Sequence, residues 1–426
     1  MLVNHPIRRP AVLAAVTAVV AGLLTALPAQ AKPAACPTLR TTEGWYGDNR
    51  ARLQRLIDTH CAAGARTVRT RPVAVFDWDN TVVKNDVGDA TMYWLLRNSR
   101  IRPPENGDWT TTSRHLTPRA ATALTEACPA PARPARTLPT GTDSRCADEI
   151  LSVYADGATT AGAPAFAGFD HRRTDPQYAW LAQLLRGWTR DQVASFARAA
   201  RAENLAAPVG ATRQVGTRTV TGWVRYYDQQ RDLVRTLRAA GFDVWIASAS
   251  PEPVVEVWAE GVGIAPSRTL GIRNTTERGR LTAHLAGCGG VRDGEDTMIT
   301  YIDGKRCWIN QEVFGVRGPA AERVGPAARR QVFAAGDSDT DVSFLRDATG
   351  LRLVLNRNKN ELMCRAYDNA DGRWIVNPMF IEPRKRKAAP YPCATTGYTG
   401  ADGTAQPVRR SDGSVVPDQT DSVYGS

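Results

Sequence analysis

An apolar run that ends abruptly in two acids constrains this chain more than any other feature. Residues 73–76 read VAVF, and such a run is typical of a buried strand in a parallel sheet. Asp77 and Asp79 follow at once, in the sequence DWDNT. Open α/β sheets bind ligands beyond the carboxyl ends of their strands, where these two acids are expected to lie. The pentapeptide alone fits a polar turn equally well, so the rest of the chain must decide.

The same pattern of an apolar run followed by polar residues recurs later in the chain. Further buried strands are expected at 244–247, 331–334 and 351–355. Helices are expected at 225–240, 252–260 and 359–370, with Ser250 as the N-cap of the second. A hairpin is expected between 269–273 and 280–285. This alternation predicts an α/β fold with a doubly wound, Rossmann-like parallel sheet.

Residues 87–235 have a different character, because strand-like runs are scarce there. Apolar residues recur at helical spacing in 93–96, 178–185 and 193–199. We therefore expect a mostly helical cap, inserted after the first strand and its acids. The core would then consist of residues 73–86 and 236–383.

The two ends of the chain are expected to lie outside this core. Residues 32–72 are expected to form an N-terminal arm with one helix at 48–63, where apolar residues share a face. Residues 384–426 are rich in Gly, Pro, Thr, Ser and Asp, and we expect a disordered tail that Cys393 could pin.

Residues 1–31 have the pattern of a signal peptide that is removed on export. Arg8 and Arg9 precede an apolar stretch at 11–27, and Ala29-Gln30-Ala31 offers a cleavage site. A retained anchor helix is the alternative. No later stretch of the sequence is long and apolar enough to span a bilayer. A secreted or extracytoplasmic protein is therefore expected.

All eight cysteines follow the expected cleavage point, and an even number in an exported chain indicates disulfides. Eight cysteines allow about 105 pairings, so the connectivity does not follow from the sequence. We expect sequence neighbours to pair, because each bond then closes one loop. The absence of a CxxC or Cys/His cluster argues against zinc. The cysteines are Cys36, Cys61, Cys128, Cys146, Cys288, Cys307, Cys364 and Cys393.

The charge of the chain points to anionic partners. The formal net charge is +11, from 54 basic and 43 acidic residues, and a basic surface attracts phosphates, nucleic acids or membranes. The sequence has no aromatic–basic repeat of the kind that binds nucleic acid, and the basic run 384–387 is expected to be solvated. Small anionic substrates are therefore expected, and nucleic acid is not.

Four polar clusters are expected to converge on one edge of the sheet. Carboxyl ends of parallel strands share an edge, so clusters far apart in sequence can meet there. Together they supply carboxylates, a hydroxyl group and a lysine, which suit Mg²⁺ and a phosphate. The clusters are DWDNT at 77–81, SAS at 248–250, GK at 304–305 and GDSDTD at 336–341.

This arrangement resembles the phosphatase branch of the haloacid dehalogenase superfamily. DWDNT is similar to its first motif, WIASAS to its second, Lys305 in IDGK to its third and GDSDTD to its fourth. The resemblance covers residues 73–83 and 243–376, and it implies a helical cap after the first motif. It also implies a hydrolase that acts on a small phosphorylated metabolite.

The resemblance assigns a role to each matching residue. Asp77 would be the nucleophile that forms an aspartyl-phosphate. Asp79 would protonate the leaving oxygen and then activate water. Ser248 would bind a phosphoryl oxygen, and Lys305 would balance charge on the carboxylate and the phosphoryl group. Lys359, which follows the fourth motif, is the competitor for the role of Lys305.

The resemblance also implies a metal site. Asp77, Asp337 and the backbone carbonyl of Asp79 would hold Mg²⁺. Asp341 would support the metal from nearby, through water or through Lys305.

The residues around the first motif suggest a substrate class. The run DWDNTVVKNDV is similar to the start of phosphoserine phosphatases, which implies that Asp86 meets a substrate ammonium. The run LNRNKNELMCRAYDN at 355–369 is similar to phosphorylcholine phosphatases, and Trp78 or Trp94 could join an aromatic cage. SAS departs from the Gly-Gly pair that follows the second-motif serine in phosphoserine phosphatases.

These observations predict an exported, Mg²⁺-dependent phosphomonoesterase. Its substrate would be small and phosphorylated, and an amine such as phosphorylcholine or phosphoserine is one candidate. Two alternatives stay open: an exported phosphotransferase, and a non-catalytic surface protein that binds phosphate. The second acid, Asp79, argues against the latter, because binding alone does not need it.

Overall fold

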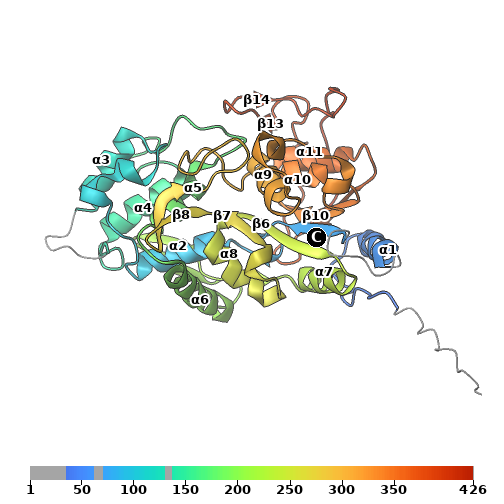
Figure 1. The fold of residues 1–426 in the computed structure, drawn as a ribbon, viewed down its shortest axis with the longest axis horizontal. Helices are drawn as coiled ribbons and strands as arrows, with labels where there is room; N and C mark the ends of the chain where they lie inside the picture. The colour runs from blue at the N-terminus through green and yellow to red at the C-terminus, as the bar shows by residue number, and fades with distance from the viewer. Residues whose placement is uncertain (1–34, 62–70, 130–136, 426) are drawn as a thin grey trace, which may run out of the picture. The chain divides into compact units, whose positions relative to one another are not determined.

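The computed structural model describes residues 35–61, 71–129 and 137–425. Its core is a six-stranded sheet in the order β12-β11-β10-β1-β6-β7, in which all neighbours are parallel. Figure 1 labels β6, β7 and β10 of this sheet. Since β1 lies between β6 and β10, its carboxyl end marks the switch point where such sheets bind ligands. The strands are β1 (Val73–Phe76), β6 (Asp243–Pro251), β7 (Thr269–Ile272), β10 (Phe333–Gly336), β11 (Leu351–Asn356) and β12 (Trp374–Pro378).

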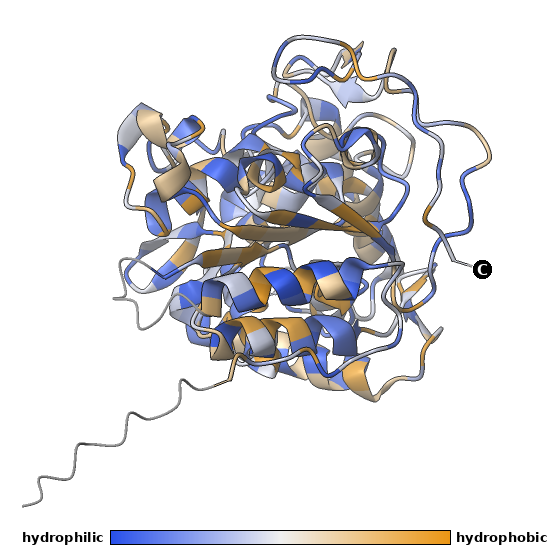
Figure 2. Cartoon of the chain, turned by 90° about the vertical axis from the view of Figure 1, so that its right-hand side faces the viewer, coloured by the Kyte–Doolittle hydropathy of each residue, from blue (hydrophilic) through white to orange (hydrophobic). Residues whose placement is uncertain are grey.

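Helices cover both faces of this sheet, as Figure 2 shows with the apolar strands between them. Alternate residues of β1 enter two different cores, since Ala74 and Phe76 belong to one and Val75 to the other. This confirms the predicted doubly wound sheet. The first core receives α1 (Asn49–Cys61), α7 (Asp228–Ala239) and α8 (Glu252–Ala259), and the second receives α9 (Asp303–Glu312), α10 (Val342–Asp347) and α11 (Asn360–Asp368).

A mostly helical cap is inserted after β1, as predicted. Strand β2 (Val83–Lys84) pairs with β5 (Arg225–Tyr226), so the chain leaves and re-enters the core side by side. This pair places the return to the core before the predicted boundary at 235. The cap contains α2 (Val87–Arg97), α3 (Pro118–Ala127), α4 (Ser144–Asp156), α5 (Pro176–Leu184), α6 (Arg190–Ala206) and the hairpin of β3 (Thr212–Val215) and β4 (Arg218–Thr221).

The hairpin predicted after the second core helix has a different first strand. Strand β9 (Arg280–Leu285) pairs with β8 (Asn274–Glu277). Residues 269–272 instead form β7, which extends the main sheet beside β6. All four residues of β7 are buried, and a short apolar run of this kind fits a strand covered on both faces.

The C-terminal segment, residues 384–425, is ordered and packs on the core, so the prediction of a disordered tail was wrong. Its few apolar side chains are spread through polar sequence, yet they enter the second core cluster together. Composition alone missed them because each is isolated. The segment contains β13 (Tyr398–Thr399) and β14 (Ala405–Gln406), and its buried members of the cluster are Tyr391, Cys393, Val408, Val416 and Val423.

All eight cysteines form disulfides between sequence neighbours, as predicted. The bonds are Cys36–Cys61, Cys128–Cys146, Cys288–Cys307 and Cys364–Cys393. The predicted signal peptide lies outside the described residues. Of the helices that the structure describes, none combines the length and the apolar character needed to cross a membrane.

Candidate active site

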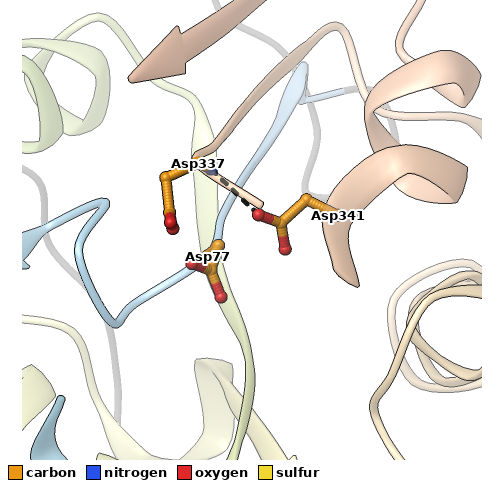
Figure 3. A group of neighbouring side chains, drawn as sticks. All are labelled: Asp77, Asp337 and Asp341. Carbon is orange, nitrogen blue, oxygen red and sulfur yellow. Dashed lines mark hydrogen bonds between the residues drawn. The ribbon is translucent and has the colours of Figure 1, made fainter. Parts of the chain in front are cut away.

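Three buried carboxylates meet at the carboxyl edge of the sheet (Figure 3). Asp77 follows β1, while Asp337 and Asp341 come from the turn after β10. One oxygen of each lies within 4.8 Å of the others. Buried carboxylates so close together repel unless cations compensate them. Clustered carboxylate oxygens are ligands for a hard divalent cation such as Mg²⁺, so the donor set fits this ion.

Lys305 supplies one compensating charge from inside the cluster. Its Nζ lies 2.7 Å from Asp77 Oδ1 and 2.6 Å from Asp341 Oδ1, and the side chain is 0% exposed. Burial lowers the pKa of this ammonium, but the charges of Asp341 and Asp77 outweigh burial and raise the pKa above its usual value. Lys359 is exposed at the start of α11. Of the two lysines, Lys305 is therefore the one in the site.

The turn before α9 places Lys305 in the cluster. A Cβ on Gly304 would lie 1.7 Å from the carbonyl oxygen of Ile299, so only glycine fits there. Ile302 has φ of 41°, which is rare for a β-branched residue. Its amide donates to the carbonyl of Thr340, in the turn that carries Asp341. The strained turn is thus fixed against the acidic turn that Lys305 contacts.

Backbone amides and a threonine hold the carboxylates in place. Asp341 Oδ2 accepts from the amides of Asp337 and Ser338, at 2.9 and 3.1 Å (the first of these is the dashed line in Figure 3). The Thr81 hydroxyl lies 3.0 Å from Asp77 Oδ2 and 2.8 Å from Asp337 Oδ1. Sequence reasoning gave Thr81 no role, although it closes the DWDNT motif.

The protonation of Asp77 depends on its neighbours. Burial, followed by the charge of Asp341, raises the pKa of the Asp77 carboxyl well above its usual value, while Lys305 acts to lower it. A divalent cation bound beside Asp77 would favour the carboxylate further.

Asp79 is held apart from the three clustered acids by two serines. Its Oδ2 accepts from Ser250 Oγ at 2.8 Å and from Ser248 Oγ at 3.1 Å, and its Oδ1 accepts from the amide of Val87 at 2.7 Å. Burial and the nearby Asp86 raise the pKa of Asp79 well above its usual value. A carboxyl with a raised pKa can hold a proton near neutral pH, as a general acid must.

Ser250 does not have the predicted role as a helix cap. The residue at the N-cap of α8 is Pro251, which makes no side-chain capping bond. The Ser250 hydroxyl bonds Asp79 instead. The register of β6 explains this, because Ser248 and Ser250 are two residues apart and so point to the same side of the strand.

Arg357 is a site residue that sequence reasoning missed. It follows β11, and its NH1 donates to Asp337 Oδ2 at 2.6 Å with the side chain 24% exposed. Burial lowers the pKa of this guanidinium, but Asp337 outweighs burial and raises it. The rule that located the other residues applies here too, because Arg357 comes directly after a buried strand at the same edge.

A cavity of about 450 Å³ lies beside the acidic cluster. A smaller pocket of about 40 Å³ is lined by Asp77 and Asp79 and shares Asp86, Tyr178 and Arg357 with the larger cavity. The aromatic lining is not the predicted one, since Trp78 is fully buried and Trp94 stacks on Phe196. The acids that line the larger cavity are Asp86, Asp89 and Asp175, and the aromatic residues are Tyr93, Tyr154, Tyr178 and Trp223.

The acids of this cavity are fixed by hydrogen bonds. Asp86 caps α2, because its Oδ1 accepts from the amide of Asp89 at 2.9 Å. Asp89 Oδ1 accepts from the hydroxyl of Tyr154 at 2.7 Å. Burial, with the charge of Asp86, raises the pKa of Asp89 to about 7. Asp86 thus lines both the larger cavity and the small pocket beside Asp77 and Asp79.

The sequence of residues 136–346 matches the family described as haloacid dehalogenase-like hydrolase. The matched range contains the second, third and fourth motifs, and the fold places the first motif beside them. The chain belongs to the haloacid dehalogenase-like hydrolases. No curated protein matches it.

Three solved structures resemble this chain to different degrees. A conserved protein of unknown function from Anaerococcus prevotii DSM 20548 shares 20% identity at a TM-score of 0.57, over 79% of this chain and 92% of its own. A protein of unknown function from Bordetella pertussis Tohama I shares 17% at a TM-score of 0.43, over 73% of this chain and 99% of its own. A substrate-bound phosphoserine phosphatase shares 12% identity at a TM-score of 0.29, over 67% of this chain and 86% of its own.

In this haloacid dehalogenase-like hydrolase the two neighbouring acids lie in different surroundings. Asp77 lies among carboxylates that can share a cation, next to a fixed ammonium. Asp79 lies outside that group, and its carboxyl oxygens accept hydrogen bonds from two hydroxyl groups and one amide. The two neighbouring acids therefore differ in their partners, since a cation pairs with Asp77 and only neutral donors bond Asp79 among the described contacts.

Proposed function

We propose that this protein is a Mg²⁺-dependent phosphomonoesterase that works through an aspartyl-phosphate on Asp77. The observation that carries the proposal is the contrast between its two neighbouring acids. Asp77 is paired with Lys305 at 2.7 Å, whereas the Asp79 carboxyl has no cation among the hydrogen-bond partners that the structure describes. A nucleophile needs its charge, and a general acid needs its proton.

The reaction takes two displacements at phosphorus. In the first, a carboxylate oxygen of Asp77 attacks the phosphorus, the ester P–O bond breaks, and Asp79 gives its proton to the leaving alcohol. In the second, Asp79 takes a proton from water as the water oxygen attacks the same phosphorus. The bond between phosphorus and Asp77 breaks, which releases phosphate and restores the carboxylate.

The cation site in this proposal uses residues that already lie together. Asp77 and Asp337 would hold Mg²⁺ with the backbone carbonyl of Asp79, and Asp341 would support them through Lys305. When bound, the ion would offset the negative charge of the phosphoryl oxygens. Lys305 keeps Asp77 oriented in both steps.

The cavity supports a small phosphorylated amine as substrate. Asp86 and Asp89 place two carboxyl groups on its wall, and Tyr93, Tyr154 and Tyr178 add aromatic surface. Carboxylates and aromatic rings are the groups that recognise ammonium ions. Phosphorylcholine, phosphoethanolamine and phosphoserine are the simplest substrates of this chemistry.

A screen of phosphate release tests the proposal. Purified protein is assayed over a panel of phosphomonoesters, with Mg²⁺ and with a chelator, beside the Asp77→Asn variant. The expected result is Mg²⁺-dependent release that is lost in the variant, with amine esters preferred. Added alcohols that become phosphorylated in place of water would instead identify a phosphotransferase.

We also propose that the protein is exported. Four disulfides support this, because such bonds persist in oxidising compartments. Cleavage after Ala31 would leave every cysteine in the mature chain.

A further inference from the structure

The C-terminal segment, residues 384–425, reaches the loop that carries Arg357 into the active site. This loop, residues 356–358, begins at Asn356, the last residue of β11, and ends in Asn358, whose φ of 61° lies in the left-handed region. The Asn358 amide donates to Asn356 Oδ1 at 2.9 Å, which closes the loop around Arg357. The conformation of three residues therefore decides where the guanidinium points.

Tyr391 of the C-terminal segment braces the far side of this loop. Its hydroxyl lies 2.8 Å from Asn358 Oδ1 and 3.4 Å from Asn356 Oδ1, and its side chain is fully buried. The disulfide between Cys364 and Cys393 ties the same stretch to α11. The tyrosine is thus fixed in the core and not only laid over its surface.

A second contact comes from the end of the segment. Asn356 Nδ2 donates to Asp421 Oδ1 at 2.9 Å and to the carbonyl of Val423 at 2.6 Å. Asp421 also accepts from the hydroxyl of Tyr367 at 2.6 Å. Both asparagines that flank Arg357 are therefore held by side chains or carbonyls of the C-terminal segment.

We propose that residues 384–425 are a working part of the active site, because they aim Arg357 at Asp337. Arg357 is a positioning residue, which acts on the cation site through the carboxylate it pairs with. It also lines the small pocket beside Asp77 and Asp79. This inference rests on the proposed function, since it assumes that the pocket binds a cation and a phosphoryl group.

The charge of Arg357 has opposite effects on the two ligands. Asp77, Asp337 and Asp341 face two cations, Lys305 and Arg357, so the cluster carries one net negative charge when all are ionised. Removing Arg357 makes the cluster more negative, which favours Mg²⁺ and disfavours phosphate. If Arg357 only kept the fold intact, its removal would weaken the binding of both Mg²⁺ and phosphate.

The test measures the binding of Mg²⁺ alone, and then of inorganic phosphate with Mg²⁺ present, to the full-length protein by calorimetry. Arg357→Gln is expected to bind Mg²⁺ more tightly and phosphate more weakly, each by about tenfold. Arg357→Lys keeps the charge, so its affinities for Mg²⁺ and for phosphate are expected to stay close to those of wild type. Tyr391→Phe is expected to move both affinities in the same directions as Arg357→Gln, by roughly two- to tenfold for one hydrogen bond.

Two changes in the same segment serve as controls. Tyr398→Phe also removes one hydroxyl, and Arg410→Gln removes an ion pair with Asp368, but neither residue contacts the 356–358 loop through a described bond. Both are expected to bind like wild type. The inference is overturned if Arg357→Gln weakens the binding of both ligands. It is also overturned if the affinities of Tyr391→Phe match those of wild type while those of Arg357→Gln change. Wild-type protein that binds neither ligand would overturn the proposed function itself.

Discussion

Replacement of Lys305 by methionine tests how the acidic cluster is held. Methionine keeps most of the apolar stem but removes the ammonium group, which lies 2.7 Å from Asp77 and 2.6 Å from Asp341. No water can replace the lost cation without entering a site where the lysine has 0% exposure. The variant therefore leaves two buried carboxylates without their shared partner.

The expected cost follows from that burial. Removing one partner of a buried ion pair destabilises a protein by about 3–5 kcal/mol. Catalysis is expected to fall by about 10²-fold or more, because a fixed charge that stabilises the transition state is lost. Mg²⁺ is expected to recover part of the stability, since it supplies positive charge to the same carboxylates.

The pH dependence of this cost has a definite sign. Burial raises the folded-state pKa of Asp77, and Lys305 lowers it, so the variant raises that pKa further. A carboxyl whose pKa is higher in the folded state favours folding below its unfolded pKa and loses this effect as the pH rises through its folded pKa. The difference in unfolding free energy between wild type and variant is thus expected to be larger at about pH 8 than at about pH 5.

Urea unfolding at the two pH values, with and without Mg²⁺, gives these differences. Lys359→Met is the matched control, because Lys359 is exposed, and a change within about 0.5 kcal/mol is expected. A Lys305→Met protein with wild-type stability and turnover would refute the reasoning. So would a Lys359→Met protein that loses activity.

Three further predictions concern the cavity and the cell compartment. Asp86→Asn, which can still cap α2, is expected to lower kcat/KM for phosphorylcholine by about tenfold relative to that for an aryl phosphate, whose leaving group carries no ammonium; an unchanged ratio would contradict an ammonium site. Since the pKa of Asp89 is raised to about 7, the wild-type protein loses stability as the pH rises through 7. Asp89→Asn does not have this loss, so its free energy of unfolding in urea is expected to rise relative to that of wild type over the same pH range. A difference in unfolding free energy that does not change with pH would contradict this. Secreted protein is expected to begin near Lys32 and to lack free thiols; N-terminal sequencing that finds Met1 would contradict export.

The sequence predicted which side chains meet at the carboxyl edge of the sheet, because a local signal marks each of them. Asp77, Ser248 and Asp337 each follow an apolar run, and the rule for parallel sheets brings such ends together. The cysteine pairs were predicted for the same reason, since each bond closes a short loop. Lys305 needed the resemblance as well, because it lies on the first turn of a helix and not at a strand end.

Features that depend on long-range contacts were missed or misread. Ser250 reads equally well as a helix cap, and only the position of Asp79 shows where its hydroxyl points. The C-terminal segment looks disordered by composition, because its buried side chains are few and far apart. Their effect appears only when Tyr391 meets Asn358, just after β11, and Asp421 meets Asn356, the last residue of β11.

The central claim is that Asp77 carries the phosphoryl group during turnover, and one trapping measurement tests it most directly. Enzyme in steady state with a good substrate is quenched in acid and reduced with borohydride, which converts an aspartyl-phosphate to homoserine, and the peptides are analysed by mass spectrometry. Homoserine at position 77, absent without substrate and absent in Asp77→Asn, is the expected result. Efficient phosphate release with an unmodified Asp77, or with homoserine at another aspartate position, would contradict the account.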